Sequence, residues 1–488
     1  MRHDWHFKGF VVTDANAVKD LKTHEFAKDL SDATLRAFQS GVNMEMSLGN
    51  SAYAANLPQL FKEGRITEAQ LDDAARPILE DKIRLGLFEH PYVDESLARQ
   101  TLEAPDHRKE ARRAAERSAV LLRNEGGLLP LKPAQYKTIA VLGPLADSRT
   151  DIVGSWVFAN DPSESVTVVS GLREQTGPST GIEYAQGVQI SRKFPSFFDA
   201  FLKEKHQTPW TQQQAAQEFT KAVQLAKDSD LAVMVLGEAQ DMSGEMASRS
   251  SLDLPGKQQE LLEAVVAAGK PVVLVLLNGR PLNITWASEH VPAILEAWYP
   301  GTQGGNAIAD LLFGKAVPGG KLPFTWPRNV GQVPLFYGHT ASHAPNMQGK
   351  RYWNEESTPL FPFGFGLSYA KFAFSNLQVS KAQVKKGEPV DVAVNVENTS
   401  DVPGDEVVQL YVHQQYGTSS RPVRELKGFN RVSLAAHGKE TVRFTLAADD
   451  LTYWSSATKS WIEDASTFDV WAGGNSSADL HGSLIVVP

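Results

Sequence analysis

The sequence predicts a chain that combines α/β architecture with a C-terminal all-β domain. Near the N-terminus, short apolar runs alternate with helical patterns, which is typical of parallel strands joined by helical crossovers. In the middle, four runs are apolar nearly throughout, as strands buried on both faces are. In the last quarter, apolar and polar residues alternate and turn residues recur at close intervals, which indicates a β-sandwich.

Length, charge and composition limit the classes of protein to which the chain can belong. At roughly 150 residues per domain, 488 residues correspond to about three domains. The net charge of −9 disfavours a nucleic-acid partner, because phosphate binding needs clustered Lys and Arg. The absence of cysteine excludes disulfides, zinc–thiolate sites and a cysteine nucleophile.

Targeting and membrane segments are not expected in this chain. No stretch of about 18 apolar residues occurs, so we expect no membrane span and no membrane partner. The first residues, MRHDWHFKGFVVTD, lack the apolar core of a signal peptide and run almost at once into an expected strand.

Residues 1–88 read as a short β-α-β-α segment. The runs GFVVTD at 9–14 and GVNMEMS at 41–47 predict strands. Helical patterns follow at about 28–40 and, as one long helix or a pair, at 52–86. Two strands are too few for a parallel sheet with both faces covered, so this domain looks unfinished. Residues 89–118 predict a polar linker that ends in a basic helix at 108–118.

Residues 119–335 predict an open, mostly parallel sheet with helices between the strands, such as 213–228 and 257–268. The expected strands are 139–144, 231–238, 271–279 and 293–301. Ligands of such sheets bind at the carboxyl ends of the strands, which here are Gly143, Glu238, Asn278 and Pro300.

The remaining residues divide into a connector and a sandwich. Residues 336–370 are rich in aromatic residues, glycine and proline, and we expect an ordered connector. Residues 371–488 contain the alternating runs DVAVNVENTS, VVQLYVHQ, ETVRFTLAA and TFDVWAGG, which predict the β-sandwich.

Two carboxylates stand out by position. Asp14 ends the first apolar run, and a carboxylate at the end of a barrel strand reads as catalytic; a helix cap or a turn residue is the alternative. Glu245 lies in AQDMSGEMASRSSLDLPG, a loop that leaves the ligand-binding edge of the second sheet. The alternative interpretation of Glu245 is a solvated surface glutamate without a catalytic role.

Other motifs predict structure rather than chemistry. The glycines of GTQGGNAIADLL at 301–312 could hold an anion at a helix start, but tight turns and close helix packing explain them better. The histidines show no metal-binding spacing such as HExxH, and no GxSxG motif supports serine acyl transfer.

The motifs taken in order resemble glycoside hydrolase family 3, in particular its bacterial periplasmic β-glucosidases. KGFVVTDANAV resembles the nucleophile segment of that family, and GEAQDMSGEMASRSSLDLP resembles the loop that carries its acid/base glutamate. Further similar motifs are GVNMEMS, LPLK, VLGPLAD, GSW, NGRPL, WYPGTQGGNAIADLLFGKAVPGGKLPFTWP, PFGFGLSY and RPVRELKGFNRVSL. The resemblance spans essentially the whole chain.

The resemblance implies an architecture of three parts. Residues 1–88 would be the C-terminal remnant of a (β/α)₈ barrel and would hold its last two strands. Residues 119–335 would be an α/β sandwich domain, and residues 371–488 a fibronectin type III-like domain. The sugar-binding residues from earlier barrel strands would be absent.

The resemblance also implies roles for individual residues. Asp14 matches the nucleophile and Glu245 the general acid/base of a retaining mechanism with two carboxylates. Trp156, in GSW, resembles an aromatic residue that flanks the leaving-group site; a core tryptophan is the alternative. Position 15 is Ala where some relatives carry Trp, so one leaving-group contact is missing or supplied elsewhere.

The implied activity is hydrolysis of terminal β-D-glucosyl, or alternatively β-xylosyl, residues of a small glycoside or oligosaccharide. No metal or cofactor is expected. A full-length relative would be periplasmic or secreted. The rival reading is a catalytically impaired fragment or a non-catalytic sugar-binding or interaction protein, because most of the barrel would be missing. Exposed apolar surface on such a remnant predicts a homo-oligomer.

Overall fold

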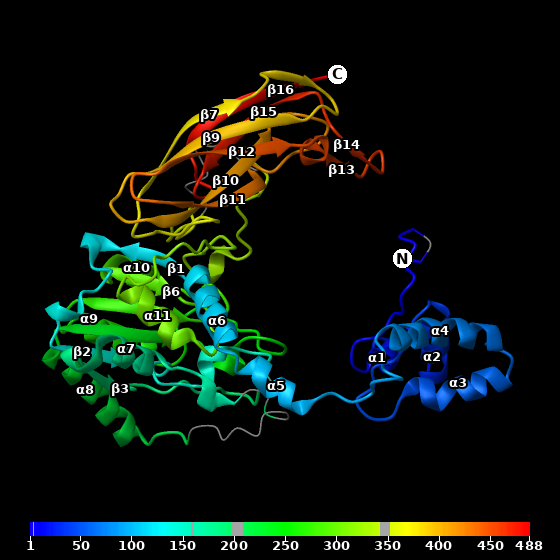
Figure 1. Ribbon diagram of the computed structural model, residues 1–488, viewed down its shortest axis with the longest axis horizontal. Helices are drawn as coiled ribbons and strands as arrows, with labels where there is room; N and C mark the ends of the chain where they lie inside the picture. Colours follow the sequence, from blue (N-terminus) through cyan, green and yellow to red (C-terminus); the bar gives the residue numbers. More distant parts are fainter. Residues whose placement is uncertain (3, 158–160, 197–198, 200–207, 342–351) are drawn as a thin grey trace. The chain divides into compact units, whose positions relative to one another are not determined.

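A computed structural model describes residues 1–2, 4–157, 161–196, 199, 208–341 and 352–488. The chain divides into two compact units, Met1–Ala104 and Pro105–Pro488, and each is described here by itself. Figure 1 shows the elements of both units, coloured from blue at the N-terminus to red at the C-terminus.

The first unit is built from helices. Asp29 caps the start of α2 through its side chain, and Thr67 with Gln70 forms a capping box at the start of α4, so local sequence sets both boundaries. A small core contains the buried side chains of Val18, Phe38 and Leu60. The helices are α1 (Ala17–Thr23), α2 (Leu30–Gln39), α3 (Ala52–Lys62), α4 (Glu68–Arg84) and α5 (Glu95–Leu102).

The structure corrects the two strands expected in this unit. Residues 9–14 and 41–47 run side by side but form one isolated parallel bridge, between Val12 and Met44. Side chains take part in the pairing: the Val11 amide donates to Asn43 Oδ1 at 2.9 Å, and the Met46 amide donates to Thr13 Oγ1 at 3.0 Å. Because these side chains replace main-chain acceptors, a regular ladder does not develop.

The α/β part of the second unit contains a six-stranded sheet in the order β1-β6-β5-β4-β2-β3. Only β1, at one edge, runs antiparallel to its neighbour, which confirms the prediction of a mostly parallel sheet. The sequence interpretation missed β1 and β3, which lie at the two edges. The strands are β1 (Val120–Asn124), β2 (Thr138–Leu142), β3 (Gly181–Ala185), β4 (Leu231–Gly237), β5 (Val272–Leu277) and β6 (Ala293–Glu296).

Helices cover both faces of this sheet, so both faces are buried (Figure 1). Successive side chains of β4 alternate between two hydrophobic clusters: Val233 belongs to the cluster that includes α7 and α11, whereas Met234 belongs to the cluster that includes α8 and α9. This alternation explains why the strand is apolar throughout. The helices are α6 (Pro105–Ser118), α7 (Val168–Thr176), α8 (Gln212–Asp228), α9 (Gln258–Val266), α10 (Thr285–His290) and α11 (Gly304–Leu312).

The glycine-rich start of α11 serves close packing, as predicted. A Cβ atom at Gly305 would lie 2.0 Å from the Thr167 carbonyl oxygen, and one at Gly171 of α7 would lie 2.2 Å from the Gly305 carbonyl oxygen. The main chains of α7 and α11 therefore meet at a distance that only glycine permits.

The C-terminal part of the second unit is a β-sandwich, which confirms the prediction. One sheet has the order β11-β10-β15-β16-β8 and the other β12-β9-β7, and valines and leucines of both sheets form the core between them. The strands are β7 (Phe372–Val379), β8 (Gln383–Lys385), β9 (Val390–Asn398), β10 (Gly404–Gln414), β11 (Glu425–Leu434), β12 (Lys439–Leu446), β13 (Tyr453–Ser455), β14 (Ser460–Ile462), β15 (Ser466–Gly473) and β16 (Leu480–Val487).

Candidate active site

The loop that carries Glu245 begins directly after β4, at the carboxyl edge of the parallel sheet. Gly237, the last residue of β4, has a φ of +139°, and a Cβ atom there would lie 2.0 Å from the Leu277 carbonyl oxygen of β5. Only glycine fits this approach, and it lets the chain turn away from the sheet. We call residues 238–256 the β4 loop.

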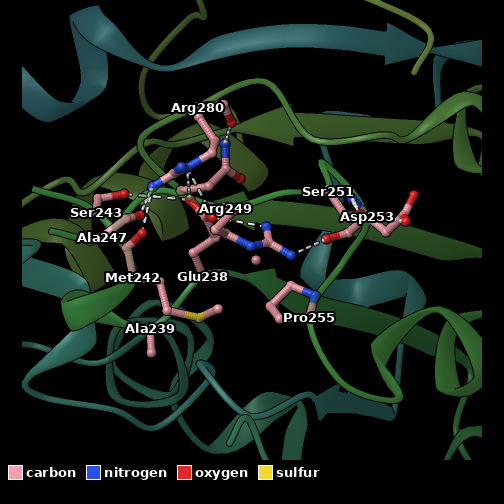
Figure 2. Close-up of polar contacts among 12 residues, drawn as sticks. Glu238, Ala239, Met242, Ser243, Ala247, Arg249, Ser251, Asp253, Pro255 and Arg280 are labelled. Carbon is pink, nitrogen blue, oxygen red and sulfur yellow. Dashed lines mark hydrogen bonds and ion pairs between the residues drawn. The ribbon is translucent and has the colours of Figure 1, made fainter. Parts of the chain in front are cut away.

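The first residue of the β4 loop, Glu238, is fully buried and paired with two arginines. Its carboxylate accepts from Arg249 Nη1 at 2.9 Å and from Arg280 Nε at 3.1 Å. Ser243 Oγ also donates to it, at 3.4 Å. A buried carboxylate needs such partners because the charged group has lost its water. Figure 2 shows this cluster of Glu238, Arg249 and Arg280.

The same two arginines fix the main chain of the β4 loop. Arg280 Nη2 donates to the carbonyl oxygens of Met242 and Ala247, the latter at 3.0 Å, and Arg249 Nη2 donates to that of Asp253 at 2.7 Å. The segment between Met242 and Ala247 is therefore held at both ends (Figure 2).

Glu245 lies within the segment between Met242 and Ala247. Its side chain differs from that of Glu238 in both burial and partners. Its side chain is exposed, and among the described residues its carboxylate has no hydrogen-bond or ion-pair partner. The following residue, Met246, has a left-handed φ of 54°. A carboxyl group that is free of protein partners on an anchored loop can give and take a proton.

A second layer of polar contacts supports the start of the β4 loop. The Gln240 amide donates to Asp151 Oδ1 at 2.8 Å, and Ser148 Oγ donates to Asp151 Oδ2 at 2.6 Å. Burial raises the pKa of the Asp151 carboxyl. Arg192 Nη1 donates to the carbonyl oxygen of Asp241 at 2.8 Å and forms an ion pair with its carboxylate.

Trp156 lies close along the chain to this second layer. It follows the short 3₁₀ helix Asp151–Val153, which contacts the 3₁₀ helix Gln240–Met242 of the β4 loop. The Trp156 side chain is 51% exposed, so the alternative of a core tryptophan is wrong. The structure thus places Trp156 and Glu245 on segments that are joined by direct contacts.

Glu296, at the end of β6, is another buried carboxyl at this edge. It accepts from the Trp298 amide at 2.8 Å and from Asn278 Nδ2 at 3.0 Å. Burial raises the pKa of Glu296 well above its ordinary value, and the charge of Glu238 acts in the same direction. Asn278 Nδ2 also donates to the Arg280 carbonyl oxygen at 2.9 Å. Of the four strand ends predicted from sequence, the one at Glu238 therefore begins the loop, and the one at Asn278 supports the arginine that anchors it.

Asp14 belongs to the first unit and is described within it. It follows the extended segment 9–13, and its side chain is exposed. Its Oδ1 atom accepts from the adjacent Ala15 amide at 2.7 Å, and its carbonyl oxygen accepts from the Ala17 amide at 3.2 Å. Asn16, and not Asp14, holds the position before α1, and its side chain makes no capping bond. Asp14 is thus the turn residue between the extended segment and α1.

The sequence interpretation missed Arg249 and Arg280. The sequence could have indicated these arginines, because a carboxylate at the end of a strand that is buried on both faces needs a cationic partner. Glu238 ends such a strand, and Arg249 and Arg280 follow the strand ends of β4 and β5.

Within the described ranges, no group of three or more His, Asp or Glu side chains could hold a metal ion. In the same ranges, no helix is both long enough and apolar enough to cross a membrane.

Comparison with protein families matches three segments of the chain. Residues 119–369 match the glycosyl hydrolase family 3 C-terminal domain, residues 406–476 a fibronectin type III-like domain, and residues 1–80 the glycosyl hydrolase family 3 N-terminal domain. Together these matches cover most of the chain.

Curated proteins and solved structures give similar results. The chain is 40% identical to a periplasmic β-glucosidase of Salmonella typhimurium and 35% identical to a β-xylosidase of Formosa agariphila, over 99% and 98% of its length. It superimposes on a β-glucosidase from Erythrobacter marinus with a TM-score of 0.87 at 35% identity, over 100% of its length. The chain spans 64% of the length of each of these three relatives.

Proposed function

Since this chain belongs to glycoside hydrolase family 3, we propose that it hydrolyses terminal, non-reducing β-D-glucosyl residues with retention of configuration. The observation that carries the proposal is the environment of Glu245. This exposed carboxyl, which has no partner among the residues that the structure describes, sits on a loop that two arginines anchor to the sheet. The sheet edge is where ligands of such folds bind.

In the proposed mechanism, Asp14 is the nucleophile and Glu245 the general acid/base. The Asp14 carboxylate attacks the anomeric carbon while Glu245 protonates the departing glycosidic oxygen, which yields a glycosyl ester and the free alcohol. Glu245, now ionised, takes a proton from water, and the resulting hydroxide displaces Asp14 from the anomeric carbon. Glu245 ends protonated and Asp14 ends ionised, so the cycle closes without a metal or cofactor.

The substrate class is proposed from the names of the similar proteins. Relatives are named as β-glucosidases and as a β-xylosidase, and one β-glucosidase structure contains glucose. Terminal β-D-glucosyl residues are therefore the first choice and β-D-xylosyl residues the second. The half-exposed Trp156 offers an aromatic face for the leaving group. A periplasmic location is supported by the name of the Salmonella protein.

A second candidate function is sugar binding without turnover. It is favoured by the surroundings of the Asp14 carboxylate: among the described residues, this group accepts a hydrogen bond only from the amide of its own neighbour, Ala15, so no other group fixes its orientation. A nucleophile displaced by about 1 Å can lose on the order of 10²-fold in rate, so a weakly held Asp14 would leave a binding protein.

An assay with 4-nitrophenyl β-D-glucoside separates these candidates. We expect the chain to release nitrophenol far more slowly than the roughly 1–10³ s⁻¹ typical of enzymes, because it spans 64% of the length of its relatives, and we expect NMR to show β-glucose as the first-formed anomer. Asp14→Ala should abolish turnover, and added azide should not restore a product of retained configuration. The control Asp73→Ala, at an exposed carboxylate on α4, should leave the turnover rate unchanged.

Two outcomes decide between the candidates. Near-normal activity in Asp14→Ala would exclude the proposed nucleophile, and saturable sugar binding without any turnover would favour the second candidate.

A further inference from the structure

A cavity of about 440 Å³ lies between the β-sandwich and the segments that precede it, within the second unit. The preceding segments contribute Lys321 and Phe365–Leu367, and the sandwich contributes Phe374 of β7, Glu406 of β10 and residues 472–475 and 477–480. This volume falls within the range of about 300–1,000 Å³ that is typical of small-molecule sites. None of the proposed catalytic residues lines it.

An ion pair that is almost completely buried forms one side of the cavity. Lys321 Nζ lies 2.8 Å from Glu406 Oε1, and the two side chains are 13% and 8% exposed. Lys321 also donates to the Gly366 carbonyl oxygen at 2.8 Å. An ammonium group has three donors, so with two partners among the described residues one donor remains for a ligand.

The opposite side is a loop whose main chain is held from several directions. Arg424 Nη1 donates to the carbonyl oxygens of Ser476 and Ala478, at 2.6 and 2.8 Å. Gln409 Nε2 donates to the Gly474 carbonyl oxygen at 2.6 Å, and the Ser476 amide donates to the Phe363 carbonyl oxygen at 2.9 Å. These bonds fix the loop without a ligand, which lowers the entropy lost on binding.

Gly474 keeps the cavity open. A Cβ atom built on Gly474 would lie 3.5 Å from Glu406 Oε1, 3.8 Å from Lys321 Nζ and 3.8 Å from the Phe374 ring. These are ordinary contact distances, and the φ angle of Gly474 is not in the left-handed region. A larger residue at position 474 would therefore occupy the cavity without straining the main chain.

The lining chemistry selects one class of ligand. Lys321, Asn475 and Ser477 offer donors, and Glu406 and Asp479 offer acceptors, as the hydroxyl groups of a polyol require. Phe365 and Phe374 offer aromatic faces for C–H groups. The formal charge of the lining, one lysine against two carboxylates, disfavours an anion.

We propose that this cavity is a second carbohydrate site, which binds a neutral monosaccharide or the end of an oligosaccharide and catalyses nothing. The site lies between the sandwich and the α/β part of the unit, so it gives the sandwich a role in holding sugar. The proposal does not depend on hydrolysis, because it rests on residues that take no part in the proposed mechanism.

Isothermal titration calorimetry with D-glucose tests the proposal in an Asp14→Ala/Glu245→Ala background, where no sugar is consumed. We expect a saturable binding event that Gly474→Val weakens at least about tenfold, since a new side chain fills the cavity, whereas any glucose bound at the catalytic site should be unaffected by this substitution. Asp479→Asn, at an exposed lining residue, should weaken the same event through the loss of a charged acceptor.

Matched variants exclude general effects of these substitutions. Gly482 of β16 has an ordinary φ and would place a Cβ atom 3.5 Å from Leu377 and Val379 side chains, so Gly482→Val controls for a valine in the same domain. Asp449→Asn controls for loss of an exposed carboxylate. Both should bind glucose within about twofold of the background chain, since neither residue lines the cavity.

A crystal soaked in glucose locates the site directly. Electron density for a sugar against Phe374 and the Lys321–Glu406 pair is the expected result. Unchanged glucose affinity in Gly474→Val, sugar density only at other places, or binding of inorganic phosphate in preference to glucose would overturn the proposal. Hydrolysis by the Gly474→Val chain with Asp14 and Glu245 intact should persist, so a failure of this inference is distinguishable from a failure of the proposed function.

Discussion

Glu238 and Glu245 lie on the same loop, yet their surroundings differ completely. Glu238 is buried between Arg249 and Arg280, whereas Glu245 is exposed and has no partner among the described side chains. Position in the sequence distinguishes them poorly, because both follow a buried strand within a few residues. Their contacts indicate that Glu238 anchors the loop, whereas Glu245 is available for the proposed chemistry.

For Glu245, we predict a loss of activity that depends on the leaving group. Glu245→Ala should slow glycosides of poorly acidic alcohols by about 10²–10⁴-fold, since these leaving groups need protonation in the transition state. Aryl glucosides of acidic phenols should lose far less in the glycosylation step. The check is a series of aryl β-glucosides with single-turnover kinetics, with Glu260→Ala on α9 as the exposed control. Equal losses across the series would assign Glu245 to binding only.

For Glu238, we predict a large loss of stability. Glu238→Ala leaves two partly buried guanidinium groups without their counter-charge, and removing one member of a buried ion pair costs about 3–5 kcal/mol. Urea denaturation followed by near-ultraviolet circular dichroism measures this change. Glu110→Ala removes the partner of the exposed Arg113 and should cost less than about 1 kcal/mol. A similar small cost for Glu238→Ala would contradict the anchoring role.

At the scale of helices and strands, the sequence predicted the strands that have a regular pattern of apolar residues. The apolar runs of β4 and β5 and the alternating runs of β9 and β10 correspond to strands of the structure, because burial on two faces or one leaves a direct trace in the residue pattern. The edge strands β1 and β3 were missed, since β3 (GIEYA) is short and partly polar. The prediction of regular strands at 9–14 and 41–47 was wrong, because the side chains of Asn43 and Thr13 accept hydrogen bonds from main-chain amides of these segments.

The candidate site was predictable only in part. The similarity of the β4 loop to family motifs singled out Glu245, and the strand-end rule pointed to the correct edge of the sheet. The anchoring by Arg249 and Arg280 depends on which distant segments meet in space, and no periodicity encodes this. The exposure of Trp156 likewise is not revealed by the sequence pattern.

The contact between α6 and α11 should make stability depend on pH. Arg112 lies 2.5 Å from Asp310 and 3.6 Å from Glu116. Burial raises the pKa of Glu116 from 4.5 to about 7, and a hydrogen bond with Asp310 adds to this effect. The folded chain therefore holds this proton more tightly than the unfolded chain, so the stabilisation is complete below pH 4.5 and is lost as the pH rises through 7.

Glu116→Gln should remove this dependence. The full shift would correspond to about 3 kcal/mol, and solvent screening of this partly exposed carboxyl reduces the expected loss of wild-type stability to about 1–2 kcal/mol as the pH rises from 4.5 through 7. The variant should lack that part of the slope. Urea midpoints at several pH values measure the difference. Glu110→Gln, on the same helix with an exposed carboxylate, is the control. An unchanged slope in Glu116→Gln would show that the proton is not held at this contact.

At the scale of the whole molecule, the two units supply different parts of the proposed chemistry. The first unit carries the proposed nucleophile on a turn before α1, and the second carries the proposed acid/base on the β4 loop. Retaining glycosidases hold their two carboxyl groups roughly 5–5.5 Å apart, so the proposed reaction requires both groups at one glycosidic bond. The central claim is that Asp14 forms the covalent bond to the sugar.

Covalent trapping tests that claim most directly. The chain is incubated with 2,4-dinitrophenyl 2-deoxy-2-fluoro-β-D-glucoside, whose electron-withdrawing fluorine slows both steps while the good leaving group keeps the first step accessible. Peptide mass spectrometry then locates the adduct. The account predicts a single 2-deoxy-2-fluoroglucosyl ester on Asp14, which is absent in Asp14→Ala. An adduct on another carboxylate, or no adduct on the intact chain, would contradict it.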